Sequence, residues 1–105
     1  MERIETTVLK NLIFNEDYSR KVLPFIKSEY FESYHEKVVF EETAKFIIEY
    51  GNLPSKEAII IEAEKRTDIS DEGFKDISTL VTDLNEEKSD LQWLFDTTEK
   101  WCRDR

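Results

Sequence analysis

The sequence predicts an all-α protein, folded as a compact orthogonal array of about six short helices. Two observations predict this fold class. Apolar residues recur at spacings of three and four along almost the whole chain, which is the spacing of one helix face and not of a strand. Joints marked by Asn, Ser, Pro or Gly separate these stretches, so the helices are short and unequal. Such helices pack more readily as an orthogonal array than as a long parallel bundle.

The first two helices are predicted on either side of Asn15. An apolar stripe that runs from Ile4 to Ile13 marks the first one. Asn15 is the expected N-cap of the second, because two acidic residues follow it in the first turn. Pro24 blocks continuation, so this second helix is short.

Capping signals also predict the third and fourth helices. Ser33 and Glu36 have the spacing of a capping box, and Gly51 is a natural stop at the end of the third helix. Ser55 is the expected cap of the fourth. Its run of three isoleucines at 59–61 resembles a buried strand, but the flanking Glu, Ala and Lys residues favour a helix, which we predict.

The last two helices follow polar turns. The segment 68–70 caps a fifth helix, whose apolar residues from Phe74 to Leu84 keep the three/four spacing. The tetrapeptide 89–92 is a further capping box and opens the sixth helix. No repeat, linker or low-complexity segment interrupts the chain, so residues 1–105 are expected to form a single helical domain.

Charge and composition exclude several classes of protein. The net charge is −9, which disfavours direct binding to nucleic acid, while 39% hydrophobic residues suffice for a core. No apolar run approaches the roughly 18 residues of a membrane span, and the N-terminus lacks the apolar stretch of a signal peptide. Cys102 is the only cysteine, so an internal disulfide is excluded. We therefore expect a cytoplasmic protein without membrane contact.

Cofactor and metal sites are not predicted. The sequence contains no G-x-x-x-x-G-K-[ST] loop for a nucleotide. Glu32 and His35 have the Glu-x-x-His spacing of di-iron proteins, but a second histidine is lacking. An EF-hand-like register lacks its final glutamate, which makes a helix-capping turn the better interpretation; its positions one, three, five, six and twelve are Asp68, Ser70, Glu72, Gly73 and Thr79.

Catalytic residues are not predicted either. Cys102 and His35 lie near opposite ends of the chain, and no Ser or Thr sits in a Gly-flanked turn. The pairs Glu41–Glu42 and Glu86–Glu87 are expected to be solvated helix surface in so highly charged a chain. The chain by itself is therefore predicted to be an interaction module and not an enzyme.

The sixth helix carries the candidate interface. At 100° per residue its apolar side chains span an arc of about 200°, whereas a helix on a single core needs little over 100°. One flank should therefore be free for a second contact. Polar neighbours favour the flank formed by Trp93, Thr97, Lys100 and Asp104. In the alternative interpretation Trp93 is ordinary core; Cys102 is expected in the core in either case.

Several stretches together resemble the N-terminal domain of DnaB-type replicative DNA helicases. The likeness covers nearly all 105 residues in one consistent order. Val39 stands where many bacterial members have an aromatic residue, so the likeness is to the T-even-type phage branch. The stretches are Ile4–Phe14, Ser28–Ser33 with Phe40 downstream, Leu53–Ser55 and Trp93–Lys100.

The resemblance implies a helical collar on one side of a hexameric ring. Self-association and docking of primase or a helicase loader would be its functions. The motor domain, which would bind ATP and Mg²⁺ in an ATP-dependent DNA helicase, is expected to follow after residue 105. The alternatives are a free-standing helical adaptor or inhibitor and, less in keeping with the residues, a small metal-dependent or hydrolytic enzyme.

Overall fold

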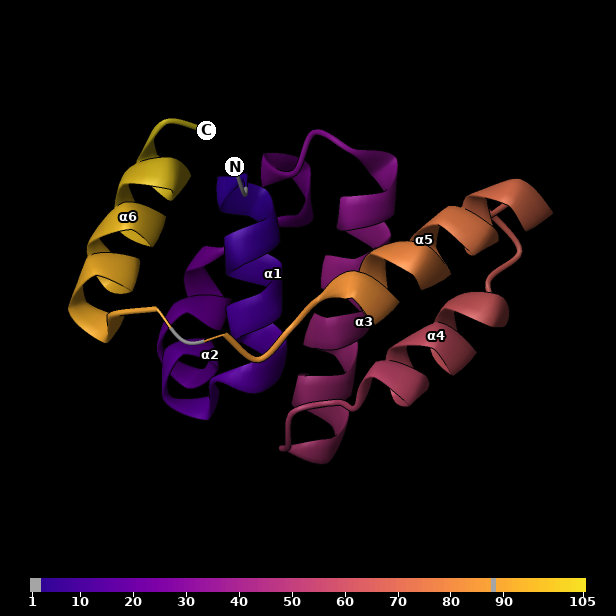
Figure 1. Cartoon of the computed structure of the whole chain (residues 1–105), viewed down its shortest axis with the longest axis horizontal. Coiled ribbons are helices and arrows are strands. Elements are labelled where there is room, and N and C mark those ends of the chain that lie inside the picture. Colours follow the sequence, from indigo (N-terminus) through magenta and orange to yellow (C-terminus); the bar gives the residue numbers. More distant parts are fainter. Residues whose placement is uncertain (1–2, 88) are drawn as a thin grey trace.

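The computed structural model describes residues 3–87 and 89–105, and within them the chain forms six α-helices, two 3₁₀ helices and no strand (Figure 1). This confirms the predicted all-α class. The radius of gyration, 13.0 Å, is that of a compact chain of about 100 residues. The elements are α1 (Ile4–Phe14), α2 (Glu16–Val22), η1 (Leu23–Phe25), η2 (Ser28–Tyr30), α3 (Tyr34–Tyr50), α4 (Lys56–Glu64), α5 (Asp71–Asp83) and α6 (Leu91–Arg103).

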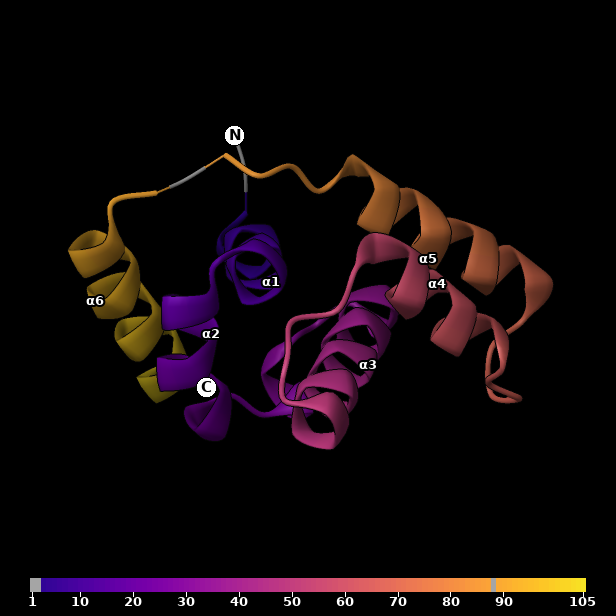
Figure 2. The same ribbon diagram turned by 90° about the horizontal axis from the view of Figure 1, so that it is seen from below.

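The helices form two groups on either side of the molecule. Figures 1 and 2 show α4 and α5 side by side at one end, packed against α3, while α6 lies at the other end beside α2. α1 lies between these groups and contacts both α2 and α3. After α5 the chain crosses the molecule past α1 to reach α6 (Figure 2). The last helix is therefore far from the helix that precedes it and packs on the start of the chain.

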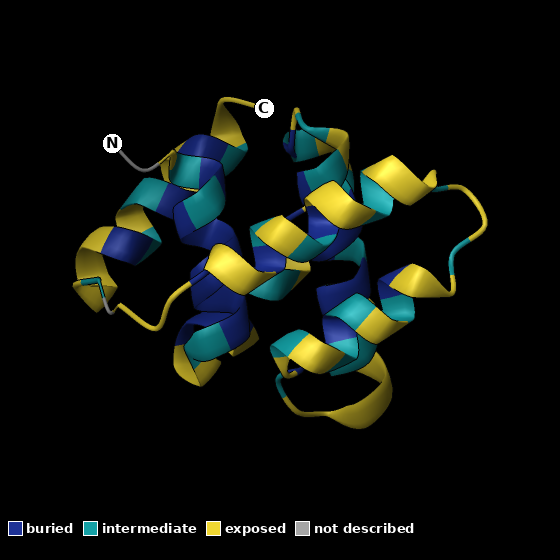
Figure 3. Cartoon of the chain, turned by 45° about the vertical axis from the view of Figure 1, so that its right-hand side comes forward, coloured by how far each residue is buried: buried dark blue, intermediate teal, exposed yellow. Residues whose placement is uncertain are grey.

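One contiguous hydrophobic cluster joins the two groups. Buried residues line the inner faces of the helices, and exposed residues cover the outside (Figure 3). Burial of each large aliphatic side chain contributes about 1.5–3 kcal/mol. The largest side chains with less than 2% of their surface exposed are Tyr18, Phe31, Leu9, Leu12, Ile59, Ile77 and Leu94. None of the helices in the described residues combines the length and apolar content needed to cross a membrane.

Four of the predicted helix ends are confirmed. The side chain of Asn15 accepts a hydrogen bond from Tyr18 N, and Ser55 and Ser70 cap α4 and α5 in the same way. Gly51 ends α3 with a φ of 72°, in the left-handed region that glycine adopts without strain. At the end of α2, Pro24 lies in η1, so the chain tightens there into a 3₁₀ turn.

Two predicted capping boxes are partly wrong. Ser33 is the N-cap residue of α3, but its side chain makes no capping bond. Instead, the Glu36 carboxylate accepts a hydrogen bond from the backbone of Ser33 and lies 3.3 Å from Arg3. At α6 the cap is Asp90, one residue later than Ser89, because its carboxylate accepts from Trp93 N at 2.9 Å.

Candidate functional site

α6 is fixed to the rest of the molecule by one face. Leu94, Thr98 and Trp101 are buried on this face, as their spacing of four and three residues requires. The Trp101 ring packs edge-on against Phe31, with 5.0 Å between the ring centroids, and edge-on against Tyr30. These contacts leave the two flanks of α6 on either side of the buried face free to face outward.

A buried hydrogen bond sets the position of α6 relative to α2. The hydroxyl groups of Tyr18 and Thr98 are 2.7 Å apart, and the Tyr18 ring stacks on Phe95 with 5.9 Å between centroids. Burial raises the pKa of Tyr18 above its usual value, so the phenol remains neutral at physiological pH. The buried contacts at the junction between the two helices are thus aromatic and neutral.

The predicted flank of α6 lies at the surface. The Trp93 side chain is 52% exposed, Thr97 is half-buried, and Lys100 and Asp104 are exposed. Trp93 is therefore not a core residue, and the alternative interpretation of it is wrong. The structure brings these four side chains together on one side of the helix, and their role in an interface stays a prediction.

The opposite flank of α6 lines a groove that the sequence analysis did not identify. This groove lies beside the contact of α6 with α2, is lined by residues of α2, α6 and the two 3₁₀ helices, and has a volume of about 510 Å³. Both flanks of α6 are therefore available, whereas only one was predicted. Cys102 was expected in the core, but it is half-buried and lines this groove. Burial raises the pKa of its thiol. The apolar lining residues are Val22, Phe25, Tyr30, Phe95 and Cys102.

Charged side chains border the same groove. Lys21 Nζ lies 4.7 Å from the centroid of the Phe95 ring, a cation–π distance. Arg103 and Glu99 also line the groove and make no ion pair within the part of the chain that the structure describes. A signal for this groove is present in the sequence. Phe95 and Cys102 are seven residues apart on one helix face, and Phe25 follows a proline, but nothing local places Phe25 beside α6.

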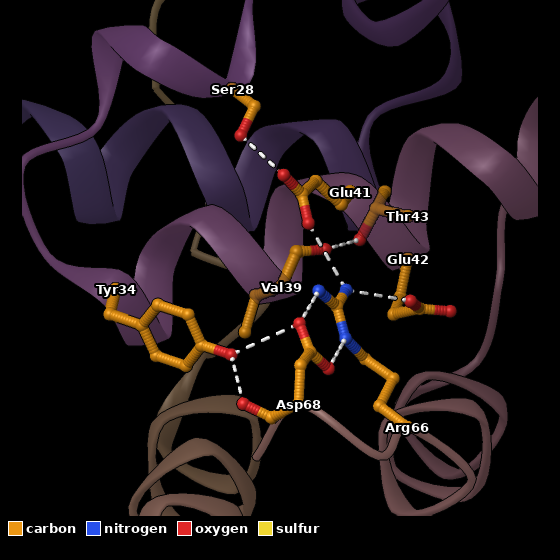
Figure 4. A network of polar contacts seen from close by, with 8 residues as sticks. All are labelled: Ser28, Tyr34, Val39, Glu41, Glu42, Thr43, Arg66 and Asp68. Carbon is orange, nitrogen blue, oxygen red and sulfur yellow. Dashed lines mark hydrogen bonds and ion pairs between the residues drawn. The ribbon is translucent and has the colours of Figure 1, made fainter.

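A cluster of polar contacts joins the α4–α5 hairpin to α3 (Figure 4). Arg66 forms two parallel hydrogen bonds to Asp68, at 2.9 and 2.8 Å, and its Nη1 atom also donates to Glu41 and Glu42. The Arg66 guanidinium holds the pKa of Asp68 down at about 2. Ser28 completes the cluster by donating to Glu41 at 2.6 Å. The cluster is an ion network in which one guanidinium binds three carboxylates, of which Glu42 is buried and Glu41 and Asp68 are partly exposed.

This network corrects the interpretation of Glu41–Glu42 as solvated surface. Glu42 is buried and its carboxylate lies 3.0 Å from Arg66, while Glu41 is bonded to both Arg66 and Ser28. The sequence gives no local sign of this, because Arg66 is 24 residues away from Glu42. The pair Glu86–Glu87 is exposed, as predicted, but it lies between α5 and α6 and not on a helix.

The residues of the two metal-binding patterns in the sequence have other partners in the structure. Glu32 accepts a hydrogen bond from Arg105 at 3.0 Å, and His35 lies 3.7 Å from Asp76. In the EF-hand-like segment, Asp68 binds Arg66 and Ser70 caps α5, so these side chains act within the fold. Among the described residues, no group of three or more His, Cys, Asp or Glu is arranged to hold a metal ion.

Two buried carboxylates lie where the ends of the chain approach each other. Glu5 is bound by Arg105 at 2.9 Å and lies 3.4 Å from Arg3, which also contacts Glu36. Burial raises the pKa of Glu36, and the positive charge of Arg3 opposes this shift. The arginines thus compensate buried negative charge and tie the end of α6 to the start of α1.

Comparison with known proteins identifies a related helicase. No protein-family profile matches the chain. The chain is 33% identical over 98 residues to the DnaB-like replicative helicase of Enterobacteria phage T4. The alignment covers 93% of this chain but only 20% of the T4 helicase. The resemblance to the phage branch of the DnaB-type replicative helicases, predicted from the sequence, is therefore confirmed over nearly the whole chain.

Proposed function

We propose that this chain is the N-terminal interaction domain of a phage replicative DNA helicase. In this role it docks a primase or a helicase loader and supports assembly of the hexamer. The observation that carries the proposal is the similarity to the T4 DnaB-like replicative helicase, which extends over 93% of the chain and spans one fifth of that protein. A segment of this relative size suits an accessory domain better than a motor.

The residues of the chain support a binding role. The sequence has no phosphate-binding loop, and the Arg66 side chain is already bound by three carboxylates of the chain itself. In the whole protein, ATP and Mg²⁺ would act in a separate motor domain. The −9 charge suits a domain that does not itself bind DNA, so the motor domain would make the DNA contacts. Both domains would act in the cytoplasm of the host.

The candidate docking surfaces are the two flanks of α6. Trp93 is large, aromatic and half-exposed, and polar residues surround it, which is the usual composition of an interface anchor and its rim. We assign the flank formed by Trp93, Thr97, Lys100 and Asp104 to contact between subunits or with primase.

A domain exchange tests the proposal directly. In the T4 helicase, the segment aligned to this chain is replaced by residues 1–105, and the chimera is compared with a deletion of the same segment. We expect the chimera to form hexamers in analytical ultracentrifugation and to unwind forked DNA with ATP, and the deletion to lose stable hexamers. A chimera that assembles no better than the deletion would contradict the proposal.

The parent gene separates this function from a free-standing adaptor or inhibitor. A reading frame that continues beyond residue 105 into a Walker A sequence is expected for the helicase. A stop codon at this position would favour the adaptor.

The chain alone should neither hydrolyse ATP nor hold DNA tightly. Because like charges repel, its Kd for single-stranded DNA should be weaker than about 1 µM at roughly 50 mM salt. Fluorescence anisotropy with a labelled oligonucleotide measures this affinity, and a phosphate-release assay measures ATP turnover. ATPase activity that follows the folded domain through successive columns would refute the first statement.

A further inference from the structure

We propose that the groove between α2 and α6 binds one amphipathic α-helix of a partner protein, with apolar anchors between two carboxylates about two helical turns apart. The inference deepens the proposed function and rests on it for the assumption that the partner is a protein. The groove is a different surface from the docking flank assigned above, because it lies on the side of α6 opposite to Trp93.

The shape and lining of the groove suit a helix. Its volume of about 510 Å³ falls in the range of sites that bury a sizeable ligand. Phe25 is 70% exposed at its edge, although burial of a phenylalanine side chain is favourable. The groove runs between helical walls, and such grooves accept the apolar face of a helix, whose anchors recur at i, i+3, i+4 and i+7.

The charges around the groove select the partner. Two cations, Lys21 and Arg103, and one carboxylate, Glu99, border it, which gives a local charge of +1 on a chain whose net charge is −9. Lys21 lies over Phe95, and Arg103 follows Phe95 by eight residues, so the backbone positions beside the two cations are about 12 Å apart along α6.

This spacing specifies the charge pattern of the bound helix. Carboxylates seven or eight residues apart on one face would reach both cations, and large apolar residues between them would fill the groove. Glu99 lies midway between Phe95 and Arg103 and would repel a carboxylate in the middle of the ligand. The partner is therefore acidic at both ends of its contact face and apolar or basic at the centre.

A second copy of this chain is a less suitable occupant. The net charge of −9 makes two free copies repel each other at long range, and contact between subunits in the proposed hexamer is assigned to the Trp93 flank and not to this groove. Charge complementarity with an acidic-ended helix instead favours encounter with a different protein. Sedimentation of the chain at about 100 µM distinguishes the two occupants, because a dimer that Phe25→Ser converts to monomer would show that the groove binds a second copy and would overturn the inference.

The direct test uses a displayed library of helical 16-residue peptides as the probe, selected on the immobilised chain. We expect enriched sequences to carry Leu, Phe or Trp at i and i+3 or i+4, with Asp or Glu at positions seven or eight residues apart. The Kd of the most enriched peptide is then measured by fluorescence anisotropy. Enrichment of basic-ended helices, or no enrichment, would overturn the proposal.

Variants locate the binding site. Phe25→Ser should weaken the selected peptide about tenfold or more, and Lys21→Glu with Arg103→Glu should do the same. A peptide in which lysines replace the two carboxylates should regain affinity for the double charge-reversal variant. The matched control Ile48→Ser, which removes an exposed apolar side chain of α3 away from the groove, should change Kd less than about twofold. Unchanged binding by Phe25→Ser, or absence of charge-swap rescue, would contradict the assignment.

Two further measurements keep the results interpretable. Urea unfolding of each variant checks that these exposed substitutions leave the fold intact. Cys102 lies in the groove, so the bound peptide should slow its reaction with a thiol reagent. If the chimeric helicase assembles and unwinds DNA but no peptide of the expected pattern binds, this inference fails while the proposed function stands. If such peptides bind but the chimera does not assemble, the proposed function fails while the groove remains a site for an acidic-ended helix.

Discussion

Where α6 packs on α2 and η2, aromatic rings and one neutral hydrogen bond hold the helices together, whereas an ion network joins the α4–α5 hairpin to α3 at the other end of the molecule. Trp101 packs on Phe31, and Tyr18 bonds Thr98, while the ion pairs of Arg105 lie beyond the end of α6. At the hairpin, Arg66 gathers three carboxylates around one guanidinium. The same hydrophobic core runs beneath both ends.

The two ends should therefore be sensitive to different perturbations. Apolar packing depends on shape and buried area and is insensitive to pH, so the α6 end should respond to truncation of side chains. An ion network depends on the charge state of every member, so the hairpin end should respond to acid and to loss of one partner. The following predictions test this contrast.

The largest effect is expected at the aromatic junction. Trp101→Ala removes a nearly buried ring and should lower the free energy of unfolding by about 3–5 kcal/mol, because it leaves a cavity between α6 and η2. The control is Trp93→Ala on the same helix, whose half-exposed ring should cost about 1 kcal/mol or less. Urea unfolding measures both. Equal losses would show that the two tryptophans do not differ in burial.

The next effect is expected at the ion network. Arg66→Met leaves the buried Glu42 carboxylate without its partner and should cost about 2 kcal/mol. Arg20→Met is the matched control, because the Arg20–Glu16 pair is exposed and should contribute about 0.5 kcal/mol at most. A loss for Arg66→Met no larger than for Arg20→Met would indicate that the network adds nothing to stability.

A smaller effect is expected from the neutral hydrogen bond. Tyr18→Phe and Thr98→Val each remove one hydroxyl and should each cost about 1–2 kcal/mol, since each leaves the other buried hydroxyl unsatisfied. The double variant should cost less than the sum, because it leaves no unpaired group. Urea unfolding of all four proteins at pH 7 completes the cycle. Simple additivity would mean that the two hydroxyls are not coupled.

The smallest effect concerns acid. Because the pKa of Asp68 is lowered from its ordinary value near 3.8 to about 2, the unfolded chain takes up a proton before the folded one. Its stabilising contribution is therefore complete above pH of about 4 and is lost as pH falls toward 2. The stability difference between wild type and Asp68→Asn should shrink over this window.

Asp83→Asn provides the comparison for this acid effect. The Asp83 side chain is exposed and makes no hydrogen bond or ion pair within the residues that the structure describes. The difference between wild type and Asp83→Asn should stay nearly constant over the same window in thermal unfolding. A constant difference for Asp68→Asn as well would contradict the role assigned to its pair with Arg66.

Much of the fold follows from short-range signals. Asn15, Ser55 and Ser70 cap helices as predicted, because a cap bond joins residues only three apart. The isoleucine run at 59–61 is helical, in agreement with the propensities of its neighbours. At α6, two adjacent residues could both cap, and the choice of Asp90 over Ser89 depends on how the chain enters the helix.

The all-α class, most helix boundaries and the likeness to a helicase domain thus follow from the amino-acid sequence, whereas the exposure of Trp93 was left open by it and is a finding of the structure. Only the tertiary structure decided that Glu42 is buried against Arg66 and that Phe25 shares a groove with Phe95. The physical reason is separation along the chain. Helical periodicity acts within a few residues, but Phe25 and Phe95 are 70 residues apart and line one groove only because the chain crosses the molecule after α5 and places α6 against α2.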